Sequence, residues 1–479
     1  MESLRTTNTG LREVINAQGA QLDAQGAQLA AQAEQIAELQ RRLGKDSTTS
    51  SKPPSSDSPY RKPAPRSARR SSGRKPGKQP GEPGTTMPLV EDPDEVVTLD
   101  PGSCSDCGTD LSEAPVSGVH RRQVTDIAPP PPPRVTEYRL VTRVCPGCAA
   151  STCALAPVMA PARVQYGPGV LARAAELTCA HYLPIGRAAA LMGSLLGVSV
   201  STGFLASVRA RAARRLEAAF LPRVRELLTQ VGVLHVDETP GRAAGSLRYV
   251  HVACTEFLTA MHTGGRSAAD IDAGGVLLGH TGTIVRDGYA GYTHLIGAHH
   301  AWCGAHLLRD LHALHTADPE NQLWAAAMAD TLTQAHRHAI TARAAGQDTI
   351  DDVVLARIRN HYRGASAAGI TDNATRAGPA AADALRLARR FREHETMILR
   401  FLVDLAVPFT NNQAERDIRP VKVQQRTSGG AWRTLDGLAD FAVVRSYLST
   451  ATKWGITSLD ALDQLFTTGA WLPPTATPC

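Results

Sequence analysis

Aromatic residues are scarce in this chain of 479 residues, in which Phe, Trp and Tyr together make up 5%. Alanine and glycine are abundant instead, so much of the apolar content consists of small side chains. The first ten residues, MESLRTTNTG, lack the apolar stretch that a signal peptide requires. We therefore expect a protein without an export signal, long enough for two or three domains.

Long uncharged runs are rare as well. One of them, residues 188–208, is long enough to span a bilayer. Gly193, Gly197 and Gly203 interrupt it, together with four Ser and one Thr. This composition is typical of a turn between two helices, so the sequence predicts no membrane segment.

The nine cysteines do not suggest a disulfide framework. Four of them form two CxxC pairs, Cys104 with Cys107 and Cys145 with Cys148, and the others are scattered. Four thiolates in two such pairs suit tetrahedral Zn²⁺ in a reducing compartment, with Gly108 and Gly147 in the tight turns. The alternative is four unrelated reduced cysteines.

The N-terminal part has two segments of different character. Apolar residues or glutamines recur every seventh residue over residues 11–43, which predicts a coiled coil that joins chains, or else a marginal helical tail. Residues 45–100 contain few apolar residues and predict a disordered basic linker. The linker has a tract without acidic residues that is either a solvated spacer or a contact to DNA phosphates; it includes Arg69, Arg70, Arg74 and Lys75.

Residues 167–225 predict helices. In the run that begins IGRAAALMG, Gly197 and the following VSVS indicate a turn, and Ser199 or Ser201 would cap a second helix rich in arginine. Two interpretations stay open: a helix-turn-helix that enters the major groove of DNA, or a helical hairpin that packs on a catalytic core.

From Val231 the sequence predicts short strands. VGVLHVD, LRYVHVACT and FLTAMHT are separated by short loops, and a helical stretch near residues 267–278 leads to TIVRD. We expect the first strand to stop at Asp237 and Glu238, before the turn-forming Pro240 and Gly241. Strand, strand, strand, helix and strand in this order predict the start of an RNase H-like core.

Three acidic residues lie at positions from which their carboxylates could bind metal ions. Asp237 and Asp287 end predicted strands, and Glu415 falls in a predicted helix start with Asn411 and Asn412 as caps. Two divalent cations held by such acids clamp the attacking and leaving oxygens of a phosphoryl transfer. Glu238 is the rival to Asp237, because neighbouring side chains on a strand point to opposite faces.

The separation of 128 positions between Asp287 and Glu415 predicts a helical insertion. At its start, Cys303 and His306 form a pair at i, i+3 that lacks further ligands, so we expect a packing role near the active site. Basic residues beyond Glu415 suit a phosphodiester substrate, although Arg419 is also placed for a surface ion pair with Glu415. They are Arg416, Arg419, Lys422 and Arg426. Pro420 is expected to bend or end the helix.

Several segments together resemble the IS66-family transposases of bacterial insertion sequences. These are the linker LGKDSTTSSKPPSSD, the two CxxC pairs, HVDETP, RDGYAGY, WCGAHLLRDL and NNQAERDIRP, in this order. The chain departs from the family pattern in the RDL after the Cys–His pair and in QQRTSGG after the third acid, where more basic or Lys-Asn type sequences would be typical.

The resemblance implies a DDE transposase that cleaves DNA strands and transfers them, with Asp237, Asp287 and Glu415 as catalytic residues holding Mg²⁺ or Mn²⁺. It implies Zn²⁺ on the four cysteines, DNA ends and target DNA as partners, and a homo-oligomer joined by the N-terminal coiled coil. Accessory proteins and a cytoplasmic, nucleoid-associated location in a bacterium are expected with it. The alternatives are a catalytically inactive DNA-binding relic or regulator, and a nuclease of the same fold that never joins strands.

The predicted fold class is therefore α/β: an RNase H-like catalytic core with a helical insertion, preceded by a coiled coil, a disordered basic linker and a zinc ribbon-like domain. The predicted segments are the coiled coil 1–44, linker 45–100, zinc-binding domain 101–160, helical region 161–230, first part of the core 231–298, helical insertion 299–405, last core helix with the third acid 406–450, and C-terminal tail 451–479.

Overall fold

The computed structural model describes residues 2–43, 78, 81, 87–127, 129–157 and 160–475. The chain divides into two compact units, residues 63–132 and the remainder. Helix α1, Glu2–Leu43, is continuous over 42 residues and takes up the predicted coiled-coil segment. Its heptad side chains Ile15, Leu22, Leu29 and Ile36 are all more than half exposed. The helix is confirmed, and its pairing with a second helix stays a prediction.

Three helices precede the sheet: α2 (Pro168–Ala175, continued by the π-helical turn η2, Glu176–Ala180), α3 (Ile185–Leu196) and α4 (Thr202–Thr229). Gly197 ends α3 in the left-handed conformation at φ 65°, and the Ser201 hydroxyl caps α4 by accepting from the Phe204 N–H at 3.1 Å. Among the described residues, every helix is too short or too polar to serve as a membrane-spanning segment.

Helix α4 belongs to the core of the molecule. One of its faces, with Leu205, Ala212 and Phe220, is fully buried, and it packs along α13 (Leu435–Lys453). Three of its arginines contact the protein's own rings: Arg209 lies over Trp432, Arg211 over Phe204 and Arg215 over Phe466. These contacts favour the helical hairpin that packs on the core over a helix free to enter a DNA groove.

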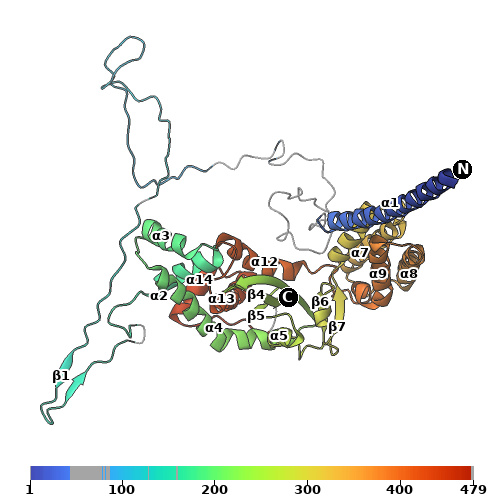
Figure 1. The fold of residues 1–479 in the computed structure, drawn as a ribbon. Coiled ribbons are helices and arrows are strands. Elements are labelled where there is room, and N and C mark those ends of the chain that lie inside the picture. Colours follow the sequence, from blue (N-terminus) through green and yellow to red (C-terminus); the bar gives the residue numbers. More distant parts are fainter. Residues whose placement is uncertain are drawn as a thin grey trace. The chain divides into compact units, whose positions relative to one another are not determined.

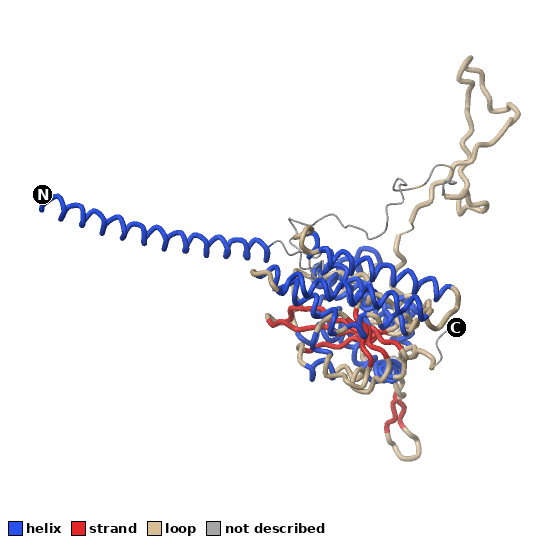
Figure 2. The backbone as a smooth tube through the Cα atoms, turned by 90° about the vertical axis from the view of Figure 1, so that its right-hand side faces the viewer, coloured by secondary structure: helices blue, strands red, loops and turns tan. Residues whose placement is uncertain are grey.

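A five-stranded sheet forms the centre of the larger unit (Figures 1 and 2). Its strands are β3 (Val233–Ala243), β4 (Ser246–Cys254), β5 (Thr259–Gly264), β6 (Thr283–Arg286) and β7 (His299–Trp302), and the short helix α5 (Ala268–Asp272) follows β5. The order across the sheet is β5-β4-β3-β6-β7. The predicted meander is confirmed, since β3, β4 and β5 pair antiparallel, while β6 and β7 run parallel to β3.

The prediction that β3 ends before Pro240 and Gly241 is wrong. The strand continues through both residues, and the chain reverses at Ala244 and Gly245, where φ is 50° and 77°. Strand β6 pairs with β3 only over Val233–His235. Beyond His235, β3 is not paired with β6, so that edge of the strand needs no backbone N–H at Pro240 and the proline is tolerated.

The prediction that a helical insertion begins at residue 299 is also wrong at its boundary. His299–Trp302 is strand β7, paired in register with Thr283–Arg286, and α6 (Gly304–Ala317) starts after Cys303. The insertion proper consists of α7 (Leu323–Ala344), α8 (Asp352–Ala374), α9 (Pro379–Glu393) and the short helices α10 (Glu395–Ile398) and α11 (Arg400–Val403). These helices share a second apolar core that includes Trp324, Tyr362 and Phe391.

The last helices are α12 (Asn412–Thr427), α13 (Leu435–Lys453) and α14 (Ser458–Thr467), and α12 and α13 pack on strands β3 to β5. Pro420 does not end α12. Ile418 before the proline and Val421 and Gln424 after it are all buried, so the helix packs on the core on both sides of Pro420. The predicted C-terminal tail contains α14, whose Leu462 and Leu465 are fully buried.

Candidate active site

Asp237 lies on β3, the central strand, opposite Val252 of β4. Burial, together with the negative charges of Glu238, Asp287 and Glu415, raises the pKa of Asp237 well above its usual range. Asp287 and Glu415, which are 128 positions apart in the sequence, therefore both lie near enough for their charges to act on Asp237. Among the described residues, the ligand atoms of these three acids do not all lie within 4.8 Å of one another. The sheet and α12 together produce this arrangement.

Glu238, the rival candidate, is already occupied. Its carboxylate accepts from Arg266 Nη2 at 2.5 Å and from the Tyr292 hydroxyl at 2.7 Å, and only 3% of its side chain is exposed. Arg266 in turn lies 3.7 Å from the centre of the Tyr289 ring. A carboxylate paired in this way has little capacity left for a cation, so the contacts favour Asp237 as the ligand.

Asp287 directly follows β6, in a loop that is held by hydrogen bonds. Its Oδ1 accepts from the Tyr289 N–H at 2.9 Å. The buried guanidinium of Arg286 donates to the carbonyls of Asp287 and Tyr289, and its Nε donates to His300 Nδ1 at 3.0 Å. Burial lowers the pKa of Arg286. The turn is therefore rigid, and it presents the carboxylate of Asp287 at the end of the strand.

Glu415 lies in the first turn of α12, as predicted. The helix begins at Asn412, but the side chain of Asn411 does not cap it. Instead, Asn411 Nδ2 donates to the Val236 carbonyl at 2.7 Å, and Asn411 Oδ1 bonds His235 Nδ1 at 2.9 Å. The helix start is thereby attached to β3 at the residue before Asp237.

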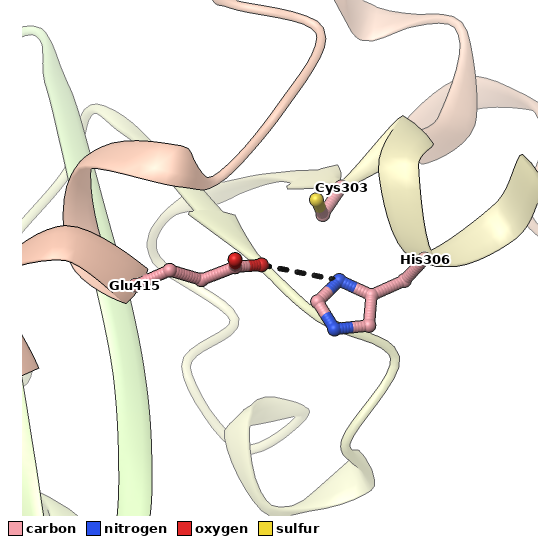
Figure 3. Close-up of side chains that lie close together, drawn as sticks. All are labelled: Cys303, His306 and Glu415. Carbon is pink, nitrogen blue, oxygen red and sulfur yellow. Dashed lines mark ion pairs between the residues drawn. The ribbon is translucent and has the colours of Figure 1, made fainter. Parts of the chain in front are cut away.

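Cys303 and His306 meet Glu415 in space (Figure 3). The three ligand atoms lie within 4.8 Å of one another, and His306 Nδ1 is 3.8 Å from Glu415 Oε1. Burial alone would lower the pKa of His306, but Cys303 and Glu415 outweigh it and raise that pKa to about 9. The sequence predicted only a packing role for the Cys–His pair. Both side chains face the third acid, so they also belong to the candidate site. The ion-pair partner of Glu415 is His306 and not Arg419.

A cleft of about 410 Å³ opens beside Asp287. Cys303 and His306 of α6 line it, and so do Trp302 at the end of β7 and Arg390 of α9. Arg390 donates to Asp310 at 2.6 Å and lies over the Trp302 ring. The cleft thus combines cationic and aromatic groups with one of the three acids, which suits an anionic substrate.

The three carboxylates are of the kind that suits divalent cations on chemical grounds. Oxygen ligands from two or three carboxylates are what Mg²⁺ uses, with substrate oxygens completing its shell. Burial raises the pKa of Asp237 most, and the charges of its acidic neighbours raise it further; a bound cation would compensate those charges.

The basic residues that follow Glu415 are not equivalent. Arg416, Arg419 and Arg426 are exposed, whereas Lys422 is half-buried and donates its ammonium to the Pro240 carbonyl of β3. Burial and then the charge of Arg426 lower the pKa of Lys422. The other predicted DNA contacts, Arg69, Arg70, Arg74 and Lys75, lie outside the described residues.

Each CxxC pair forms a tight knuckle. The Gly108 N–H donates to the Cys104 carbonyl and the Ala149 N–H to the Cys145 carbonyl, both at 2.9 Å. Gly108 is left-handed at φ 75°, as expected, but Ala149, not Gly147, takes that role in the second pair at φ 59°. The second pair lies in the hairpin of β1 (Thr142–Val144) and β2 (Ser151–Cys153).

Hydrogen bonds lower two of the thiol pKa values. The Thr109 side chain and N–H lower the pKa of Cys107, and the N–H groups of Cys148 and Gly147 lower that of Cys145. A lowered pKa favours the thiolate, which is the form that binds metal. Both knuckles are therefore prepared for a soft cation.

Three contributors to the site are not predicted by the sequence. They are Asn411, expected only as a helix cap, together with His235 and Arg266. Asn411 was marked only by standing four residues before Glu415, and nothing near Arg266 in the sequence points to Glu238. Cys303 and His306 carried a recognisable spacing, but their third ligand comes from a distant segment.

Comparisons with known families agree with this geometry. Residues 163–439, more than half of the chain, match the model of the transposase IS66 family. Residues 101–149 match the zinc-finger binding domain of transposase IS66, and residues 3–88 match a family of unknown function, DUF6444. A comparison with curated proteins found no match. The second match contains all four knuckle cysteines and supports Zn²⁺ as a bound metal, and the two IS66 matches suggest DNA as the partner.

Proposed function

The chain belongs to the transposase IS66 family, and from this premise we propose that it cleaves DNA strands and joins them to a target with the help of Mg²⁺ or Mn²⁺. The observation that supports the proposal is the place of Asp237 on the central strand, where burial and the charges of Glu238, Asp287 and Glu415 raise its pKa. The strand order β5-β4-β3-β6-β7 supports an RNase H-like core of the DDE type.

In this proposal each acid has a distinct support. The central strand holds Asp237, the Arg286-braced turn holds Asp287, and α12 carries Glu415 at a helix N-terminus that favours its charge. Two divalent cations bound between them would activate the attacking oxygen and stabilise the leaving oxygen. Glu238 holds Arg266 and Tyr292 and so maintains the wall of the site.

DNA would contact the exposed arginines of α12. Arg416, Arg419 and Arg426 extend from the helix that carries the third acid, so phosphates bound by them would lie near the catalytic carboxylates. Lys422 contributes mainly by tying α12 to β3. The basic tract of residues 61–78 would add sequence-independent affinity that falls with salt.

Two further parts complete the proposal. The knuckle cysteines would hold Zn²⁺, which is consistent with their inclusion in the matched zinc-finger segment. The exposed heptad side chains of α1 would pair with a second copy of the chain and make the transposase an oligomer.

The test is a Mg²⁺-dependent nicking and strand-transfer assay on DNA that carries the element's ends. We expect Asp237→Asn to abolish both reactions while DNA binding is retained. Asp352→Asn, an exposed acid at the start of α8, is the matched control and should react like the unaltered chain.

Three outcomes would contradict the proposal. Full activity of Asp237→Asn would show that Asp237 is not a catalytic acid. If Asp237→Asn stayed active while Glu238→Gln lost activity, the role would belong to Glu238. Cleavage without joining would indicate a nuclease, and binding without any cleavage would indicate a regulator.

A further inference from the structure

The cluster of Cys303, His306 and Glu415 offers a different set of ligand atoms from the three acids. Cys303 stands at the N-cap of α6, His306 lies in the first turn of that helix, and Glu415 comes from the first turn of α12. Their sulfur, nitrogen and oxygen atoms lie within 4.8 Å of one another (Figure 3). Ligand atoms around a tetrahedral zinc ion are roughly 3.5 Å apart, so a closure of about 1 Å completes the geometry.

Two contacts prepare these side chains for a metal. Cys303 is 1% exposed, and its sulfur accepts the Asn411 N–H at 3.2 Å at the N-terminus of α6. His306 Nδ1 is buried and makes no hydrogen bond to the described residues. The nitrogen lies 3.8 Å from Glu415 Oε1, so a cation between the ring, the sulfur and the carboxylate would replace this long ion pair with shorter ligand bonds.

The chemistry of the ligands decides which cation fits. Thiolate and imidazole select zinc and similar thiophilic ions, whereas Mg²⁺ takes oxygen ligands. Three protein ligands leave a fourth position open, and the cleft beside Asp287 is lined by the same Cys303 and His306. Zinc bound here would therefore remain accessible from the cleft.

We infer that Cys303, His306 and Glu415 form a zinc site separate from the cysteine knuckles, which competes with the magnesium site for Glu415. A zinc ion that engages Glu415 withdraws it from Asp237 and Asp287. Zinc in excess should then inhibit the Mg²⁺-dependent reaction. Binding of zinc at this cluster stands independently of the proposed function, whereas the inhibition rests on it.

Metal content of the full-length chain tests the binding. After equilibration with Zn²⁺ and removal of free metal, the unaltered chain should hold about two zinc ions, one in the knuckles and one in the cluster. Cys303→Ser and His306→Gln should each hold about one zinc ion. The matched control is Cys179→Ala, which removes another fully buried thiol, distant in sequence from the cluster, and should keep both.

Cobalt distinguishes the two sites. In a Cys104→Ser/Cys145→Ser chain loaded with Co²⁺, one thiolate-to-cobalt charge-transfer band should remain and should disappear when Cys303→Ser is added. Circular dichroism and thermal unfolding of His306→Gln show whether a loss of metal reflects a loss of fold. A full zinc content in both Cys303→Ser and His306→Gln would overturn the inference.

Inhibition is measured separately, with each variant compared with its own activity without zinc. The concentration of Zn²⁺ that halves Mg²⁺-dependent nicking should rise at least tenfold in Cys303→Ser relative to the unaltered chain. An unchanged value would refute the competition for Glu415. If the unaltered chain shows no nicking at all, the proposed function fails while the zinc content still decides the site.

Discussion

The side-chain amide of Asn411 donates a 2.7 Å hydrogen bond to the backbone carbonyl of Val236, which immediately precedes Asp237. The bond joins the start of α12 to the central strand. Because the Asn411 amide nitrogen is the donor here, its oxygen accepts from His235 Nδ1, which fixes the tautomer of that ring. Burial lowers the pKa of His235, so the ring is neutral at pH 7 and able to take this role.

Asn411→Ala should impair the site more than it impairs the fold. It leaves the buried Val236 carbonyl and His235 without their partners, at a cost of about 1–3 kcal/mol, and frees the helix that carries Glu415. We expect Mg²⁺-dependent nicking to fall on the order of tenfold to a hundredfold, as for lost supports of metal ligands.

Asn412→Ala is the matched control for that change. Asn412 is the next residue and is exposed, so its replacement should alter unfolding by less than about 0.5 kcal/mol. Equal losses of nicking in both variants would show that the Asn411 anchor has no special role.

Gly304→Ala should disturb the start of α6. A methyl group at Gly304 would collide with the Phe409 ring, which lies against it, and Cys303 is the adjacent residue. Overpacking of this kind costs about 1–3 kcal/mol and would shift the helix start. Gly364→Ala in α8 meets no atom within 4 Å and should instead raise stability by about 0.5–1 kcal/mol. Urea unfolding of both variants checks the opposite signs.

Lys453 and Asp417 form an ion pair that is almost fully buried. Lys453 Nζ donates to Asp417 Oδ2 at 2.6 Å, to the Thr259 hydroxyl at 2.7 Å and to the carbonyls of Thr255 and Leu258. Lys453→Met removes one charge and leaves Asp417 buried without it, so the free energy of unfolding should drop by about 3–5 kcal/mol.

An exposed ion pair provides the comparison for Lys453. Arg363 pairs with Glu395 at 2.8 Å but is largely exposed, so Arg363→Met should cost no more than about 1 kcal/mol. If urea unfolding showed the same loss of unfolding free energy in Lys453→Met and Arg363→Met, burial would not explain the stabilisation by the Lys453 ion pair.

The stability of the core should decrease in acid because of His262. Burial, and then the positive charge of the stacked His251, lower the pKa of His262 to about 4, and its Nε2 bonds the Asp270 carbonyl at 2.8 Å. The unfolded chain binds the proton near pH 6.5, so stability present above that pH is lost as the pH falls towards 4.

His262→Gln should therefore unfold with a weaker pH dependence between 6.5 and 4. The difference in the free energy of unfolding between these limits should shrink by up to about 3 kcal/mol. His361→Gln, at an exposed position of α8, should leave the slope unchanged. Identical slopes for the unaltered chain and His262→Gln would contradict the assignment.

Local chemistry in the sequence determined many elements by itself. Gly197 and Ser201 mark the end of α3 and the start of α4 because a left-handed residue and a capping hydroxyl act over one turn. Short strand-like segments joined by short loops placed β3, β4 and β5, and runs of apolar residues ending in an acid placed Asp237 and Asp287 at strands. The start of α12 at Asn412 was also predicted, although the side chain of Asn411 does not cap the helix as expected.

Only the tertiary structure decided what these elements do together. Pro240 and Gly241 remain in a strand because β4 pairs with them, and His299–Trp302 becomes a strand because β6 is there to pair with it. Asn411 turns from its own helix to Val236, and His306 meets Glu415 across the whole helical insertion. Such choices depend on contacts between residues far apart in the chain, and local preference carries no information about them.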